Sequence, residues 1–207
     1  MKMFTRLFFL ALFLSNSSTV FGEPGKTQFT QENIYKHFRY VTSPKETMIN
    51  VQKAALWLSK KGKSGLKEFD KPVSKWNNLD GYHSFMAVSD CSQGSLVSHP
   101  NPQLHRMKKI KNLIAQFKDF SGRAVQLDLC LRMQKNPRGA WVATTQTFIR
   151  STTLVKEPML LFQFGIRVPG YPWEVYGVLP GNADSQESPD QFVSERNALV
   201  NEWSIIN

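Results

Sequence analysis

Two segments of this chain alternate apolar and polar side chains with the two-residue period of a β-strand. In residues 125–133, one side collects Val125, Leu127, Leu129, Leu131 and Met133. In residues 159–168, one side collects Leu160, Phe162, Phe164, Ile166 and Val168. Successive side chains of a strand point to opposite faces of a sheet, so the pattern predicts two strands. Each of them has an apolar face that needs a cover.

An amphipathic helix earlier in the chain can supply that cover. The residues Ser43-Pro44-Lys45-Glu46 suit a helix start, because Ser43 and Glu46 can form a capping box and Pro44 fits the first helical position. Gly62 after two lysines suits the helix end. The apolar stripe between them consists of Met48, Val51, Ala55 and Leu58. Burying about eight apolar side chains at ~1.5–3 kcal/mol each is ample to hold this helix on the sheet.

The remaining elements follow from the same patterns. Further helices are expected over residues 31–42, 103–117 and 192–206, and further strands over 82–89, 95–98, 140–150 and 173–179. Helices followed by a largely antiparallel sheet predict an α+β domain. The opposite face of this sheet would carry the neutral polar residues Ser84, Gln126, Gln146 and Gln163.

The first residues have the plan of a secretory signal peptide. Lys2 and Arg6 precede an apolar run over residues 7–14, and Val20-Phe21-Gly22 suits a cleavage site. We therefore expect a signal peptide over 1–22, a domain over 23–180, and a linker with a C-terminal helix over 181–207. The expected location is periplasmic or secreted. No apolar run approaches the ~18 residues that span a bilayer, and the mature charge is +8, from 24 basic and 16 acidic residues.

Several classes of function lack their motifs in this sequence. The basic residues are spread without an RNA- or DNA-binding motif, so no nucleic-acid partner is expected. The cysteines and histidines lack the spacing of a metal site, and no cofactor is expected. Catalytic motifs such as GxSxG or HExxH are missing, so the protein is not expected to be an enzyme. Cys91 and Cys130 can form a disulfide across 39 residues or stay unpaired, and their spacing leaves both alternatives open.

A family resemblance emerges from motifs in order along the chain. Residues 76–85 read WNNLDGYHSF, and they are followed by Gly94 and by HPNP at 99–102. These motifs resemble the signature of single Cache domains, which are extracytoplasmic sensor modules with a PAS-like sheet. The KDFSG of 118–122 is similar to a turn of that family. GAWV at 139–142 and VPGYPWEV at 168–175 resemble its last two strand landmarks. The resemblance extends from about Ile49 to Leu179.

The resemblance implies a PAS-like antiparallel sheet, backed by a long N-terminal helix, with a ligand on the other face. Together with the alternation it yields the candidate ligand-binding residues Tyr82, His99, Trp141, Gln146 and Gln163. The ordinary alternatives are a core position for Trp141 and a turn-organising role for His99. Where the family often carries a Tyr and a Pro-Lys pair, this chain has Thr144 and Pro158-Met159. The implied strand order also separates Cys91 from Cys130, which disfavours a disulfide.

The expected function is that of an exported, sensor-type protein that binds a small polar solute on one face of the sheet. Most relatives are outer parts of transmembrane receptors. No second hydrophobic segment is present here, so the chain resembles the free-standing form. A small-molecule ligand is the expected partner, with a membrane receptor or another protein as a further one. The alternative is a secreted interaction module whose basic surface binds an acidic or membrane-bound partner.

Overall fold

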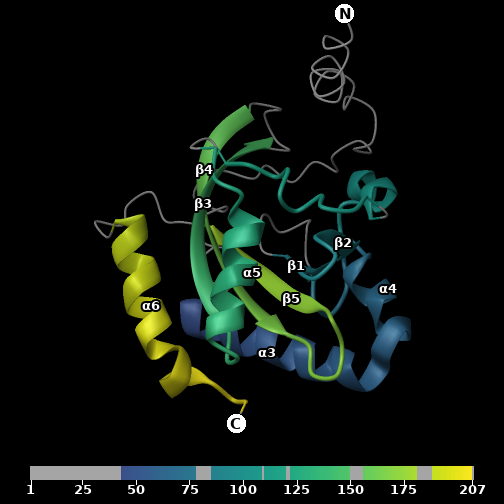
Figure 1. The fold of residues 1–207 in the computed structure, drawn as a ribbon, viewed down its shortest axis with the longest axis horizontal. Coiled ribbons are helices and arrows are strands. Elements are labelled where there is room, and N and C mark those ends of the chain that lie inside the picture. Colours follow the sequence, from purple (N-terminus) through teal and green to yellow (C-terminus); the bar gives the residue numbers. More distant parts are fainter. Residues whose placement is uncertain are drawn as a thin grey trace, which may run out of the picture.

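A computed structural model describes residues 43–77, 85–108, 110–119, 122–149, 156–180 and 188–206. Its helical elements are α3 (Pro44–Lys61), η2 (Gly62–Gly65), α4 (Leu66–Phe69), η4 (Pro102–Met107), α5 (Val125–Lys135) and α6 (Pro189–Trp203). Its strands are β1 (Met86–Asp90), β2 (Ser95–Ser98), β3 (Ala140–Ile149), β4 (Lys156–Arg167) and β5 (Glu174–Pro180) (Figure 1). None of the helices in these ranges is both long and apolar enough to cross a membrane.

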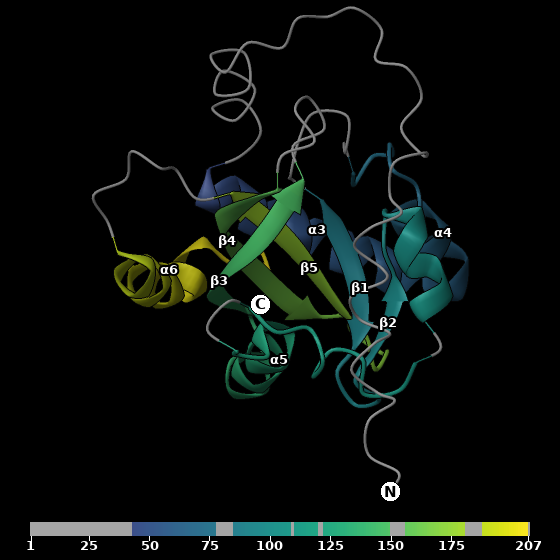
Figure 2. The same cartoon turned by 90° about the horizontal axis from the view of Figure 1, so that it is seen from above.

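The five strands form one antiparallel sheet in the order β2-β1-β5-β4-β3. Strand β3 pairs with β4 along the whole of its own length, from Ala140 opposite Gly165 to Ile149 opposite Lys156. Helix α3 lies on one face of the sheet and α5 on the other (Figure 2). The α+β class and the PAS-like sheet backed by a long N-terminal helix are thus confirmed.

Helix α3 begins and ends where its sequence predicts. The Ser43 hydroxyl accepts a hydrogen bond from the Glu46 backbone N–H at 3.2 Å, and the Glu46 carboxylate accepts one from the Ser43 backbone N–H at 3.1 Å. Both bonds of the predicted capping box are therefore present. Gly62 ends the helix with a φ of 58°, a left-handed value that glycine adopts without strain.

The core on the α3 side of the sheet is one continuous cluster of buried residues. The stripe of α3 is completely buried, and it packs with Phe162, Phe164, Ile166 and Val168 of the predicted alternating segment. Gly177 of β5 makes the contact close, because a β-carbon at this position would lie 2.6 Å from Val51 Cγ2. The missing side chain therefore lets α3 approach the sheet.

Residues 125–133 form helix α5, so the predicted strand is wrong there. The buried positions are Val125, Gln126, Leu129, Cys130 and Met133, which is helical spacing. Leu127 and Leu131 are 38% and 50% exposed. Every second member of the alternating set, Val125, Leu129 and Met133, recurs at i, i+4 and i+8, so the same residues also fit one side of a helix. Leu, Gln, Met and Arg favour helices, and β-branched residues are nearly missing from the segment.

The predicted helix over 103–117 is also wrong beyond its first turn. Only η4 (Pro102–Met107) is helical, and turns follow it. The Asn112 N–H donates to Gln93 O at 3.2 Å and the Ile114 N–H to Gly94 O at 3.0 Å. These backbone groups therefore bond to the β1–β2 turn instead of extending a helix. The other observed elements agree with their predictions within a few residues, whereas the predicted helix over 31–42 and strand residues 82–84 lie outside the described residues.

Helix α6 covers the exposed edge of the sheet. The Asn197 side chain accepts a hydrogen bond from the Trp141 N–H at 2.8 Å and donates one to the Trp141 carbonyl at 3.2 Å. Its amide thus bonds to β3 as a neighbouring strand would. An unpaired edge strand invites association with other chains, and here the terminal helix occupies it (Figure 1).

The contact at Gly177 makes a prediction about stability. Gly177→Ala should lower the free energy of unfolding by about 1–3 kcal/mol, because the added methyl group overpacks the α3 contact. Urea unfolding followed by circular dichroism measures this change. With Val51→Ala in addition, the total loss should be smaller than the sum of the two single losses. Wild-type stability in Gly177→Ala, or simple additivity, would contradict the tight contact.

Candidate ligand-binding site

A line of polar side chains crosses the α5 side of the sheet. Most of this face is apolar, with Ala87, Val142, Leu161 and Val178 in one core cluster. Within it, Gln163 lies opposite Val142 and Val178, and Thr144 lies opposite Leu161. Tyr176 lies opposite Gly165 on β4. Tyr176, Gln163 and Thr144 therefore follow a diagonal over β5, β4 and β3, where such neighbours are about 7–8 Å apart.

Two buried members of this diagonal each have a side-chain oxygen without a hydrogen-bond partner. Thr144 is 1% exposed and Gln163 is 5% exposed. Thr144 Oγ1 and Gln163 Oε1 form no hydrogen bond in the part of the chain that the structure describes. Leaving such a group unpaired costs about 1–3 kcal/mol. Burial also raises the pKa of Tyr176, so its phenol is neutral. The diagonal thus offers uncharged donors and acceptors.

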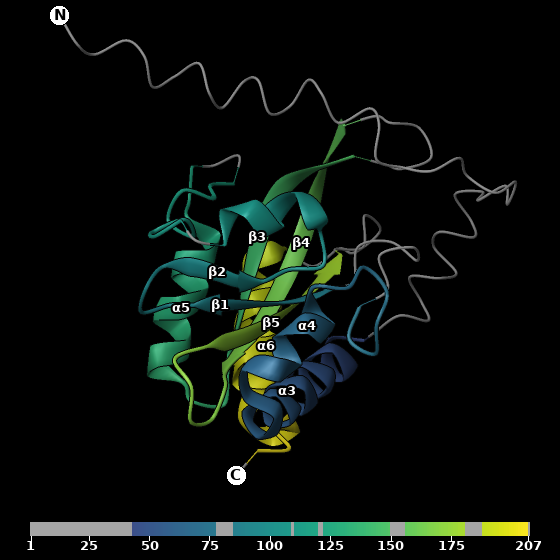
Figure 3. The ribbon, with the colours of Figure 1, turned by 90° about the vertical axis from the view of Figure 1, so that its right-hand side faces the viewer.

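The connection from β2 to β3 covers this face. Leu113 and Ile114 are 2% exposed, and Ile114 packs with the apolar residues around the diagonal. Just before α5, the Arg123 guanidinium donates to the carbonyl of Ala143, the neighbour of Thr144 on β3. Helix α5 then begins at Val125 without a capping side chain. In Figure 3, α5 lies at the left of the strands.

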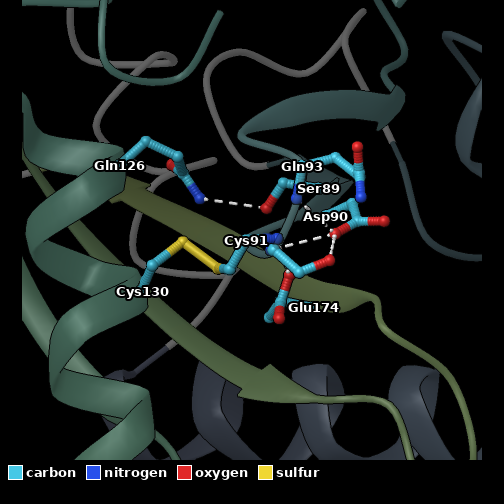
Figure 4. The surroundings of a disulfide bond; sticks show 8 residues. Ser89, Asp90, Cys91, Gln93, Gln126, Cys130 and Glu174 are labelled. Atoms are coloured by element: carbon cyan, nitrogen blue, oxygen red, sulfur yellow. Dashed lines mark hydrogen bonds between the residues drawn. A yellow bond between two sulfur atoms is a disulfide. The ribbon is translucent and has the colours of Figure 1, made fainter. Parts of the chain in front are cut away.

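A disulfide fastens this cover to the sheet. Cys91, in the turn after β1, is bonded to Cys130 of α5, with the two Cα atoms 5.7 Å apart (Figure 4). Of the two alternatives that the sequence leaves open, the paired one is confirmed. The strand-order argument against it was wrong because Cys130 lies on a helix that crosses the sheet, and not on a strand within it.

Two carboxyl groups lie beside the disulfide. Glu174 is 2% exposed, and its Oε2 accepts the Cys91 N–H at 2.7 Å. Asp90 accepts bonds from the Ser92 N–H and hydroxyl and from the Gln93 N–H. Burial, helped by the nearby Asp90 charge, raises the pKa of Glu174 to about 7, although the Cys91 N–H and Arg167 act in the opposite direction. A carboxyl group that titrates near neutral pH thus adjoins the turn that holds the cover.

His99 lies in a hydrogen-bonded turn after β2. Its Nδ1 accepts the Asn101 N–H at 3.0 Å, and its backbone N–H donates to the Asp70 carboxylate at 3.2 Å. The Phe85 ring lies 4.9 Å from the imidazole and borders the α5-side core. Burial and the nearby His105 and Lys108 lower the pKa of His99 to about 3, so it is neutral at physiological pH.

The remaining predicted site residues do not converge in the described structure. Trp141 is fully buried on the α3 side, against Phe164 and Phe192, so it faces away from Gln163 and cannot be an aromatic wall beside it. Gln126 lies on α5, where its amide donates to Ser89 Oγ at 3.4 Å, and not on the sheet. Gln146 lies on β3, but its side chain is outside the described residues, as are Tyr82 and Ser84 entirely.

Sequence reasoning missed three polar residues of this region. Thr144 was noticed only as a departure from the family pattern, and Tyr176 and Glu174 were not proposed. A signal was present for Thr144, because it has the same parity on β3 as Ala140 and Val142. A polar residue on the same strand face as two buried apolar residues indicates a buried polar position.

Comparisons with known proteins find likeness only among solved structures. No protein-family model matches the chain, and no curated protein does. A Cache chemosensory domain, described for its carboxylic acid recognition, has a TM-score of 0.44 and 14% identity, covering 74% of this chain and 99% of that one. A periplasmic sensor domain of a chemotaxis protein has a TM-score of 0.39 and 14% identity, covering 75% and 100%. A methyl-accepting chemotaxis protein from Vibrio parahaemolyticus has the same two values, covering 72% and 84%. Such TM-scores and identities do not assign a ligand to this chain.

The pKa of Glu174 makes stability depend on pH. The folded-state pKa of about 7 lies above the ordinary glutamate value of 4.5 that applies to the unfolded chain, so the folded state favours the protonated form. The resulting stabilisation is complete below pH 4.5 and is lost as the pH rises through 7, by about 3 kcal/mol in all. Glu174→Gln should remove this loss. Relative to wild type, the variant should therefore gain stability between pH 5 and 8.

Chemical unfolding of both proteins at each pH measures the difference. Taking the difference between the two proteins cancels the contribution of His99, which both contain. The lowered pKa of His99 has the opposite effect on stability, because it reduces stability as the pH falls. A difference that does not change between pH 5 and 8 would contradict the raised pKa.

Proposed function

We propose that this protein is an exported, sensor-type module that binds a small polar solute against the α5 side of its sheet, at Gln163 and Thr144. The observation that carries the proposal is the pair of buried polar atoms without partners on one face. Ligand sites are mostly apolar, with a few placed polar groups, and this face has that composition.

The polar groups favour a solute that both donates and accepts hydrogen bonds. The Gln163 amide has an acceptor and two donors, and the Thr144 hydroxyl can act as either. Neither group is charged, and the Tyr176 phenol beside them is neutral. Recognition would therefore depend on hydrogen bonds inside a buried site, where removing one partner is costly.

The β2–β3 connection is the element that such a solute would have to pass. It lies on the sheet through Ile114 and Arg123, and the disulfide holds it at the turn after β1. Entry of a solute would require a local shift of this connection while the disulfide keeps α5 in place. The solute should then stabilise the folded protein by linkage.

A thermal-shift screen tests the function. The panel consists of small carboxylic acids, amino acids and amines. At least one class should raise the melting temperature with a dependence on concentration, and calorimetry should then show a saturable site. If no compound shifts the melting temperature, the proposed function is wrong.

Thr144→Val gives a sharper test, because stability and binding should move in opposite directions. The substitution keeps the shape and removes an unpaired hydroxyl, so the free protein should be as stable as wild type or gain up to about 1 kcal/mol. Affinity for the compound found in the screen should fall about 5- to 10-fold, the value of one hydrogen bond.

Thr47→Val is the matched control. Thr47 is also buried with an unpaired hydroxyl, but it lies on α3, at the other face of the sheet. This variant should show the same effect on stability and no effect on affinity. Equal affinity losses in both variants, or none in Thr144→Val, would place the solute elsewhere.

A further inference from the structure

The C-terminal half of α3 and the turns after it form an exposed basic surface. Between Glu46 and Glu68 the chain has no acidic residue. It has five lysines there, all exposed: Lys53, Lys60, Lys61, Lys63 and Lys67. We call these residues, together with Lys75, the lysine surface. In Figure 3 the end of α3 and α4 lie side by side at the front of the molecule.

The charge of this surface is not neutralised by neighbouring acids. Among the described residues, none of its lysines forms an ion pair within 4.0 Å. The next acids along the chain are already engaged: Glu68 pairs with Lys71 at 2.5 Å, and Asp70 binds the Lys108 ammonium and the Ser98 hydroxyl. The lysine surface therefore presents a concentrated positive field to solvent.

Aromatic and apolar groups lie within the same surface. Trp57 is half-buried, four residues after Lys53 and three before Lys60, so it shares their side of the helix. The Lys75 ammonium lies 3.4 Å from the centroid of the Trp57 ring and 4.8 Å from that of Trp76. This contact brings the loop after α4 against α3. Val73, in that loop, is 55% exposed.

The kind of cation indicates the kind of partner. Residues 43–77 contain lysines and no arginine. Protein–protein interfaces are enriched in arginine and depleted in lysine. Lysine is a flexible point charge that suits a surface of anionic headgroups, while Trp belongs at the membrane–water interface. We propose that the lysine surface docks the protein onto an anionic lipid bilayer, with Trp57 and Val73 at the headgroup level. This proposal does not rest on the proposed solute site.

Vesicle co-sedimentation of the whole protein tests the docking. The protein should bind phosphatidylcholine vesicles that contain phosphatidylglycerol, should not bind phosphatidylcholine alone, and should dissociate as salt is added. Each lysine near such a surface contributes ~1 kcal/mol, about 5-fold in partitioning. The variant K60Q/K61Q/K63Q/K67Q should therefore bind at least about 100-fold more weakly. These side chains are exposed, so the fold should be retained.

A charge-matched variant separates local docking from net charge. K45Q/K111Q/K118Q/K135Q removes four exposed lysines elsewhere and should weaken binding less than about 5-fold. Val73→Ser should weaken binding severalfold, whereas Leu131→Ser, at a similarly exposed position on α5, should not.

Equal losses in the two lysine variants would overturn the proposal, as would equal binding to uncharged vesicles. Soluble polyglutamate serves as a stand-in for an acidic protein partner. If the first variant loses polyglutamate binding but keeps vesicle binding, the lysine surface serves a protein and the lipid proposal fails.

Discussion

Two glycines on adjacent strands let helices press against both faces of this sheet. Gly177 of β5 admits Val51 of α3, and Gly165 of β4 admits Leu129 and Met133 of α5. Each glycine pairs across the ladder with a large aromatic residue, Gly177 with Phe164 and Gly165 with Tyr176. Each helix therefore approaches the sheet at a position without a side chain, next to a strand position with a large one. Side chains on both faces are buried as a result, and this burial makes unpaired polar groups such as Thr144 and Gln163 informative.

The turn between β1 and β2 connects the cover of the second face to the sheet. Its Cys91 holds α5 through the disulfide, and its Gln93 and Gly94 carbonyls accept bonds from the residues that lead into the cover. The Cys91 N–H donates to the buried Glu174 carboxylate of β5. One short turn thus links a helix, a loop and a strand. Ionisation of Glu174 acts directly on that turn through the Cys91 N–H. The same turn holds the cover of the proposed solute site through the disulfide.

Local chemistry made parts of this fold predictable from sequence. The capping box of α3 depends on residues within one turn, and one face of β4 carries Phe162, Phe164 and Ile166, residue types that favour strands. The strand prediction for residues 125–133 was wrong because their alternating apolar residues fit both the strand period and the helix period. Only the scarcity of β-branched residues distinguishes the helix from the strand here. The candidate site was predicted only in part. Trp141 and Gln146 have opposite parity on one strand, so they could not share a face, whereas the pairing of Gln163 with Val142 depends on strand register.

The distribution of charge separates the two proposed interactions. The α5 side of the sheet presents neutral polar groups, and the carboxyl group beside it is largely protonated below neutral pH. The lysine surface lies instead around the end of α3, a helix that packs on the sheet face opposite to that of Thr144. A bound bilayer would therefore leave the solute-facing side free. Strand β5 contacts α3 closely at Gly177 and carries Tyr176 on its other face. This strand therefore connects the lysine-bearing helix with the proposed solute site.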